Sequence, residues 1–509
     1  MSSSILDIVN APRAAFSGAG LDHTFESAAP DAQNQVTLAP IYPEWLGDRA
    51  FSATHGARFN YVVGEMARGI ATPRMVVEAV RAGCVGFYGS AGLSPQEIEG
   101  GVEAIKRDLS LTQIAWGANL IHSPQQPGYE AAVIDLFVKQ GVKRVSASAY
   151  MKLSADIVRY TALGLSRSKD GEIIRAHHVF AKVSRAEVAE AFMAPAPQKL
   201  LSELVAAGLI SPTQAELAAL VPVAAEITAE ADSGGHTDNR PAAPLFASLS
   251  LARDRVAART GVDANAIRIG LAGGIATPHG VAAAFQMGAA YVLTGSINQS
   301  AVESGLSEAG RALLCKAGPA DVIMAPAADM FEQGVEVQVL RRGTLFGMRA
   351  KRLHGLYRSG ASFESMDQKD RDWLESVLGE PFETAWAQTK IFIEQANPKE
   401  AERAASDGNK RLALVARRYL FMGAQWAREG QEGRAADYQI WCGPAMGVFN
   451  EWVAGTPLEP VESRTVRQIA WNLMEGAARI TRAGQLRSQG VSVPSAAFNY
   501  TPQWFSGAG

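Results

Sequence analysis

The chain of 509 residues has few of the features that mark secreted, membrane-spanning or nucleic-acid-binding proteins. Its only cysteines, Cys84, Cys315 and Cys442, are too few and too widely spaced for a disulfide framework or a zinc pattern. No apolar run approaches the roughly 18 residues that span a bilayer, and the first residues lack a secretory signal. The net charge of −3 argues against nucleic acid. We therefore expect a cytoplasmic protein without membrane, nucleic-acid or metal partners.

Residues 60–300 alternate between short apolar runs and amphipathic segments. Eight runs are typical of strands: Asn60–Met66, Cys84–Tyr88, Ile114–Ala118, Arg144–Ser148, His178–Val183, Ala225–Glu230, Ile267–Ala272 and Tyr291–Thr294. Helix-like stretches lie between them, such as Thr72–Arg81, Ser94–Asp108, Tyr129–Gln140, Ser154–Leu163 and Pro278–Met287. Eight strand–helix units predict an α/β fold of the (β/α)8 TIM-barrel type, with an open doubly wound sheet plus an added domain as the alternative.

Two stretches depart from this spacing. Residues 184–222 hold three helical segments, so we expect a helical insertion after strand five that forms a substrate lid. After Ser300 the pattern predicts a hairpin around Gly334–Gly343 and then helices from about residue 363 to 490. The expected organisation is an N-terminal extension over residues 1–55, a barrel over 56–355 and a helical C-terminal domain over 356–509.

Small residues after the last two predicted strands indicate an anion site. Gly273 and Gly274 follow the seventh strand, and Thr294, Gly295 and Ser296 follow the eighth. Adjacent glycines are also common in plain turns, but two neighbouring strand ends together offer several backbone N–H donors and two hydroxyls to one phosphate. Because the loops after strands seven and eight often hold phosphate in such barrels, we expect a phosphate-bearing cofactor.

Other residues fall at the same ends of the predicted strands. Glu65, Met66 and Ala67 end the first strand, where the methionine would either fill the core or pack beside a flat ring. Asn119 follows the third strand, and its amide would either contact a heterocycle edge or stabilise a turn.

Two ionisable residues are candidates for chemistry. Lys182 ends an apolar run, where its charge either has a partner or reaches the rim. His236 lies with Gly235 in the polar loop Ser233–Pro244. A loop histidine is most often a surface residue, yet an imidazole at a barrel mouth can serve as an acid.

Together these residues resemble the FMN-dependent nitronate monooxygenase (2-nitropropane dioxygenase-like) superfamily over roughly residues 60–300. The matching elements, in the order of that superfamily, are Met66, Asn119, Lys182-Val183, Gly234-Gly235-His236, Gly273-Gly274-Ile275 and Thr294-Gly295.

A narrower resemblance covers nearly the whole chain. The phrases Ala325–Glu332, Val335–Thr344 and Asp437–Gly447 resemble the PfaD family, the trans-acting enoyl reductases of polyunsaturated fatty-acid synthases and trans-acyltransferase polyketide synthases. The resemblance implies reduction of the 2,3-double bond of an enoyl thioester on an acyl carrier protein, with NADPH or NADH as hydride donor and FMN as cofactor.

The resemblance also implies roles for individual residues. Glu65, Met66, Ala67, Asn119 and Gly235 would contact the cofactor, and Lys182 would lie near the electron-rich edge of its ring. The phosphate would be bound by Gly273, Gly274, Gly295 and Ser296, and Thr294 would also contact the cofactor. His236 would contact the thioester or donate the proton. The insertion would shape the acyl pocket, and the C-terminal helices are a candidate surface for carrier-protein docking or for a homodimer.

Three other functions compete with this interpretation. A nitronate monooxygenase-type oxidase would share the barrel and FMN, but it leaves the helices after residue 363 without a role. A non-catalytic scaffold within a synthase complex would have no need of Lys182 and His236. An inosine-phosphate dehydrogenase-like enzyme needs a mid-barrel cysteine, and none lies between Cys84 and Cys315.

Overall fold

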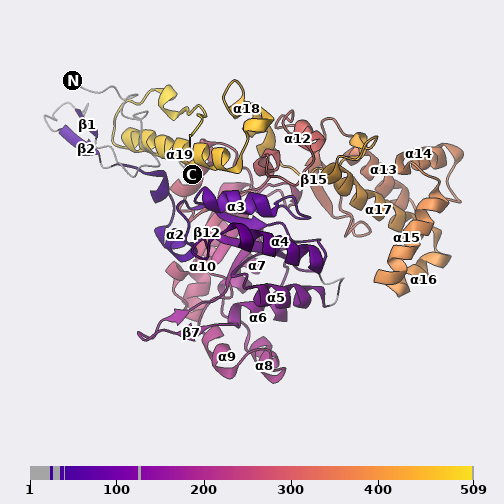
Figure 1. The fold of residues 1–509 in the computed structure, drawn as a ribbon, viewed down its shortest axis with the longest axis horizontal. Coiled ribbons are helices and arrows are strands. Elements are labelled where there is room, and N and C mark those ends of the chain that lie inside the picture. The colour runs from indigo at the N-terminus through magenta and orange to yellow at the C-terminus, as the bar shows by residue number, and fades with distance from the viewer. Residues whose placement is uncertain (1–22, 27–34, 39, 124–125, 127, 507–509) are drawn as a thin grey trace. The chain divides into compact units, whose positions relative to one another are not determined.

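We describe the protein from a computed structural model that defines residues 23–26, 35–38, 40–123, 126 and 128–506. The chain forms two compact units (Figure 1). The first, here called the barrel unit, comprises the chain up to Asp232, Asp238–Gly305 and Val448–Gly509. The second, here called the cap unit, comprises Ser233–Thr237 and Leu306–Gly447. Among the described helices, none combines the length and apolar character needed to cross a membrane.

The barrel unit is built on a closed barrel of eight parallel strands, which confirms the predicted fold class. In chain order the strands are β3 (Tyr61–Val63), β4 (Val85–Tyr88), β5 (Trp116–Ile121), β6 (Arg144–Ser148), β9 (His178–Val183), β10 (Glu226–Glu230), β12 (Arg268–Ala272) and β13 (Val292–Thr294). Each of the eight runs predicted from the sequence contributes one of them. Closure comes from parallel pairing of β13 with β3, where Val292 faces Tyr61 and Thr294 faces Val63.

Seven helices connect one barrel strand to the next, and α10 is separated from its preceding strand by another strand, β11 (Gly235–His236). The seven helices are α3 (Pro73–Arg81), α4 (Pro95–Asp108), α5 (Tyr129–Gln140), α6 (Ala155–Ala162), α7 (Ala186–Met193), α10 (Ala242–Thr260) and α11 (Pro278–Gln286). Their starts follow from local sequence. The side chain of Thr72 accepts a hydrogen bond from Met75 N, and Ser94 forms a capping box with Glu97. Proline at the first helical position stabilises both helix starts.

The eighth helix of the ring comes from the far end of the chain. Helix α19 (Val466–Ser488) packs against both α11 and α3, and so fills the position that would otherwise follow β13. A Cβ at Gly476 would lie 2.5 Å from Pro278 Cγ, which shows how closely α19 approaches α11. The indole N–H of Trp471 also donates to Ala82 O, just after α3.

The division of the chain therefore differs from the one expected from the sequence. The N-terminal part of the barrel unit stops at Gly305, whereas this boundary was expected at residue 355. The barrel unit also includes residues 448–509, which were expected to belong to a C-terminal helical domain. The reason is that a barrel needs eight covering helices, and the apolar face of α19 supplies the last one. Of the expected N-terminal extension, the described part includes a hairpin of β1 (His23–Glu26) with β2 (Gln35–Leu38), η1 (Pro43–Trp45) and α2 (Arg49–His55).

The helical insertion exists, but its position differs from that of the expected lid. Helices α8 (Gln198–Ala206) and α9 (Pro212–Ala218) follow α7 and precede β10, so they leave and re-enter at the amino ends of the strands. A bridge between Pro195 and Pro222 closes the excursion. Both helices pack against α6, and they lie near the β7 (Ser166–Arg167) hairpin that precedes β9 (Figure 1). Active-site loops occupy the opposite, carboxyl end.

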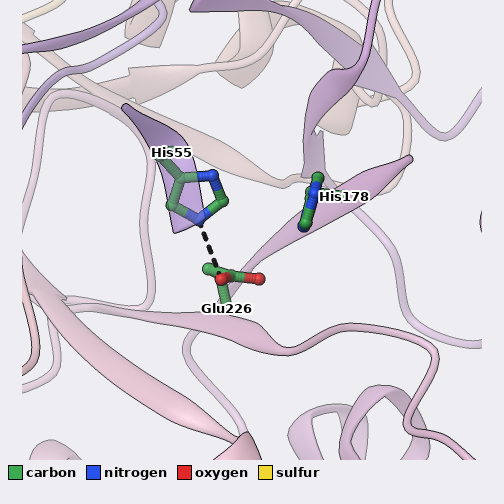
Figure 2. Close-up of side chains that lie close together, drawn as sticks. All are labelled: His55, His178 and Glu226. Atoms are coloured by element: carbon green, nitrogen blue, oxygen red, sulfur yellow. Dashed lines mark hydrogen bonds and ion pairs between the residues drawn. The ribbon is translucent and has the colours of Figure 1, made fainter. Parts of the chain in front are cut away.

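A buried charge network fills the amino end of the barrel (Figure 2). Glu226, fully buried, bonds His55 Nε2 at 2.8 Å and also pairs with Arg268. Arg144 Nε donates to His55 Nδ1 at 2.9 Å, so His55 must carry its proton on Nε2. Burial alone would raise the pKa of Glu226, but His55 and Arg268 outweigh it and hold that pKa below its usual range. The ion-paired carboxylate thus ties α2, β6, β10 and β12 together.

The cap unit combines a small antiparallel sheet with a group of helices. The sheet has the order β11 (Gly235–His236), β15 (Glu336–Leu340) and β14 (Val322–Pro326). Its helices include α12 (Glu308–Leu314), α13 (Phe346–Arg358), α14 (Gln368–Leu378), α15 (Phe382–Ala396), α16 (Pro398–Ser406) and α17 (Gly408–Glu429). Their shared core includes Phe331, Val337, Phe346 and Leu412. The expected hairpin is therefore formed with a partner strand further upstream, at 322–326.

We expect Glu226→Gln to destabilise the barrel by about 3–5 kcal/mol, because the neutral amide leaves Arg268 and Arg144 buried without a counter-charge. Urea unfolding measures the change. The matched control is Glu190→Gln, which removes a partly exposed pair with Arg255 and should cost less than about 1 kcal/mol. Equal losses for the two variants would contradict the network's role.

A second prediction concerns pH. Burial lowers the pKa of His178 to about 3, whereas an unfolded histidine titrates near pH 6.5. Between these values the unfolded state binds one more proton, so the unfolding free energy must fall as the pH is lowered through this window. We expect His178→Gln to flatten that slope by about 1.4 kcal/mol per pH unit. Urea unfolding across this pH window measures the slope, and an unchanged slope in the variant would contradict the prediction.

Candidate active site

The turns after β12 and β13 form a cradle of glycines at the carboxyl end of the barrel. Gly273 and Gly274 have φ of +82° and +72°, values that favour glycine. In the described part of the chain, the amide N–H groups of Gly273, Gly274 and Gly295 donate to no backbone or side-chain acceptor. A Cβ at Gly274 would meet no atom within 4 Å, so the space beside it is open. Unused donors next to open space suit an anion.

The first strand's predicted site residues lie beside this cradle. A Cβ at Gly295 would have a single neighbour, the sulfur of Met66, at 3.9 Å. Met66 is itself buried, and the carbonyl of Ala67 accepts Ile70 N in the turn that follows. The structure thus brings the first and last strand ends together around a methionine.

Lys182 stands between two carboxylates in the barrel mouth. Its Nζ lies 3.1 Å from Glu65 Oε1 and 3.1 Å from Glu230 Oε1. Burial alone would lower the pKa of Lys182, but the attraction of Glu230 and Glu65 outweighs it and raises the pKa above its ordinary value. Lys182 therefore keeps its charge near neutral pH, with its ammonium group fixed between β3 and β10.

Glu65 retains one unused acceptor. Its Oε1 also accepts a hydrogen bond from Ser148 Oγ at 3.2 Å, whereas its buried Oε2 has no partner among the described residues. A buried carboxylate oxygen without a donor is costly, so this atom is suited to accept an N–H or O–H of a ligand.

Two predicted contacts are already engaged within the barrel wall. Asn119 Nδ2 donates to Ser146 O at 3.0 Å and to Ser148 Oγ at 3.1 Å, so both amide hydrogens are used inside the protein. The hydroxyl of Thr294 is buried and bonds Tyr61 OH and Asn298 Nδ2. Thr294 therefore differs from the expectation that its hydroxyl faces an anion. Ser296 begins the short helix η3 (Ser296–Ser300) directly after Gly295.

His236 lies in the cap unit, on the short strand β11. It faces Val337 across the ladder, and its Nε2 lies 3.3 Å from Asp329 Oδ1. His236 lowers the pKa of Asp329 although burial opposes the change. Gly235 has a φ of +80°, and a Cβ at Gly234 would lie 2.6 Å from Cys442 Cα. The glycines therefore let the loop pack against the Asp437–Gly447 segment.

Sequence reasoning missed Glu230 and Asp329. Glu230 ends β10, whose neighbour β9 carries Lys182. The sequence could have indicated Glu230, because an acidic and a basic residue stand at the ends of two consecutive predicted strands. Asp329 gave no such signal, because it lies in a loop distant from His236 in sequence.

The histidines at the amino end could be mistaken for a metal centre. Ligand atoms of His55, His178 and Glu226 lie within 4.8 Å of one another (Figure 2). However, both nitrogens of His55 are used by Arg144 and Glu226, and Arg268 pairs with the same carboxylate. Two neighbouring guanidinium groups repel a further cation, so we interpret the cluster as a structural ion-pair network.

Comparison with known proteins identifies the family. The enoyl reductase domain of MlnA from the macrolactin biosynthesis cluster of Bacillus amyloliquefaciens is 34% identical and superimposes with a TM-score of 0.81, over 88% of this chain and 99% of that one. The chain belongs to the PfaD family. A polyunsaturated fatty acid synthase component of Thraustochytrium sp. is 40% identical over 482 residues, 92% of this chain. Polyketide biosynthesis protein PksE of Bacillus subtilis is 39% identical over 441 residues, 86% of this chain.

The PfaD-family chain spans only part of its larger relatives. It covers 32% of the Thraustochytrium protein and 57% of PksE. Residues 361–438, within the cap unit, also match the inserted helical domain of acyl-carrier-protein S-malonyltransferase.

The two cradle glycines should respond differently to substitution. A methyl group at Gly273 would lie 2.6 Å from the Ala231 carbonyl, so we expect Gly273→Ala to lower the unfolding free energy by more than about 3 kcal/mol. Gly274→Ala meets open space and should cost only the positive-φ penalty of about 1–2 kcal/mol. Denaturant titration of both variants tests this; equal costs would contradict the close approach at Gly273.

Proposed function

We propose that this chain is an enoyl reductase that reduces the 2,3-double bond of enoyl thioesters carried by an acyl carrier protein, with FMN as cofactor and NADPH or NADH as hydride donor. The observation that carries the proposal is the similarity to the MlnA enoyl reductase domain over nearly its full length. The relatives named as parts of fatty-acid and polyketide synthesis support the same process, as does the match of residues 361–438.

The barrel mouth has the chemistry that FMN requires. The free N–H groups of Gly273, Gly274 and Gly295 suit its phosphate, and open space at Gly274 leaves room for it. The unpaired Glu65 Oε2 suits a ring N–H, and the Met66 sulfur offers a polarizable surface to a flat ring. When bound, FMN would supply two-electron chemistry between the nicotinamide and the substrate's β-carbon.

Lys182 would provide a fixed positive charge to the cofactor. A cation stabilises an electron-rich ring, and the fixed position of the ammonium group avoids reorganisation during the reaction. Because Glu65 and Glu230 both pair with it, the charge is partly balanced before any ligand binds. Glu230 therefore acts as a positioning residue for Lys182.

His236 is the proposed proton donor to the α-carbon. Reduction breaks the C2–C3 π bond, adds a hydride to the β-carbon and leaves an enolate that needs one proton. Asp329 holds His236 Nε2, which leaves Nδ1 as the nitrogen that can deliver it.

The proposal predicts a yellow protein that releases FMN on denaturation. With NADPH, an enoyl thioester should gain about two mass units, the hydride and proton together.

His236→Gln should lower kcat by about 10²–10⁴-fold while FMN content stays unchanged, because it removes only the acid. Lys182→Met should reduce FMN content or reduction rate. Rapid oxygen consumption with a nitroalkane and no thioester reduction would instead favour the nitronate oxidase.

A further inference from the structure

The surface around α13 in the cap unit is unusually basic for this chain. Residues 337–363 include Arg341, Arg342, Arg349, Lys351, Arg352 and Arg358, and no aspartate or glutamate, although the whole chain has a net charge of −3. One face of α13 is buried through Phe346, Gly347, Ala350 and Leu353, and the helix packs against β14 and α17 (Figure 1). The cations therefore concentrate on the helix's exposed side.

Only part of this positive charge is matched within the protein. Arg341 and Arg342 share one carboxylate, Asp321, at 3.9 and 3.3 Å. Arg352 pairs with Asp370 at 2.7 Å, and Arg349 pairs with the buried Asp437. Lys351 and Arg358 are exposed, and neither side chain has an ion pair or hydrogen bond in the part of the chain that the structure describes.

An apolar hollow adjoins these cations. It has a volume of about 470 Å³, and its lining includes Ile323, Leu345, Met348 and Arg341. Leu345 is 42% exposed, and Met348, three positions later, is 58% exposed. Two large apolar side chains beside the hollow therefore lie open to solvent. Met348, Lys351, Arg352 and Gly355 follow the i, i+3, i+4, i+7 spacing of a single helix face.

We propose that this face, from Arg341 through Arg358, docks an acidic acyl carrier protein, with an apolar side chain of the carrier seated in the hollow. This inference rests on the proposed function, since the substrate would arrive on that carrier. A phosphopantetheine arm is attached through an anionic phosphodiester, and arginine pairs well with phosphate and carboxylate oxygens. Exposed methionine adapts to different partner surfaces. Complementary charge would mainly speed and orient the encounter.

A binding titration tests the surface without relying on catalysis. Fluorescence anisotropy of the labelled cognate carrier protein should show that Lys351→Glu with Arg358→Glu weakens binding about tenfold or more, because two attractions become repulsions. The matched control is Lys199→Glu with Lys390→Glu, which changes the net charge equally at exposed sites on the helices α8 and α15. The control should bind like the unmodified protein.

Kinetics supply the second readout. The α13 variant should raise KM for the enoyl-carrier substrate by a similar factor, yet reduce the enoyl thioester of N-acetylcysteamine at the original rate. Unchanged carrier binding by the α13 variant, or equal weakening by the control, would overturn the docking surface. Preference of the unmodified protein for RNA over carrier would also overturn it. Failure to reduce either thioester would count against the proposed function, while the titration would still decide the surface.

Discussion

The pairing of β13 with β3 is the constraint on which the candidate site depends. These strands come from opposite ends of the barrel sequence, and their parallel register places Thr294 beside Val63. The Thr294 hydroxyl, bonded to Tyr61 and Asn298, fixes that register from inside the wall. Because of this closure, the methionine after the first strand meets the glycine after the last. An open sheet would leave the same residues at opposite edges.

Buried charge is used differently at the two ends of the barrel. At the amino end, Glu226 is surrounded by His55 and arginines whose hydrogen-bonding atoms are directed at one another. At the carboxyl end, Lys182 is held by two carboxylates, but Glu65 Oε2 and the glycine amides remain unused. Buried polar atoms without a partner occur at both ends, since Glu226 Oε2, Arg268 Nε and His178 Nδ1 also lack one among the described residues. What distinguishes the carboxyl end is the open space beside Gly274, where unused polar atoms are available to a ligand.

The sequence predicted the barrel well because each strand is a short apolar run, and helices α3, α4, α6 and α11 each begin with a side-chain cap or a proline. Lys182, Met66 and the cradle glycines could be selected as candidates because each lies at or just after the carboxyl end of a predicted strand. The ring position of α19 was not predictable, because its periodicity shows only that one face is buried and not against what. The insertion was expected at the carboxyl end of the barrel, but it lies at the amino end because α7 comes between strand five and the extra helices. The chain has therefore run back to the amino ends of the strands before α8 begins. Asp329 depended on a loop geometry that no local pattern encodes.

The late arrival of α19 has a consequence for biosynthesis. The ring of helices has a gap between α11 and α3 until residues 466–488 have left the ribosome, although the eighth strand ends at Thr294. During that interval the apolar surface meant for Trp471 stays uncovered while residues 306–447 of the cap unit are translated. Nascent protein would thus remain open to chaperones throughout that interval, and the intervening segment can change length in evolution without altering the ring itself.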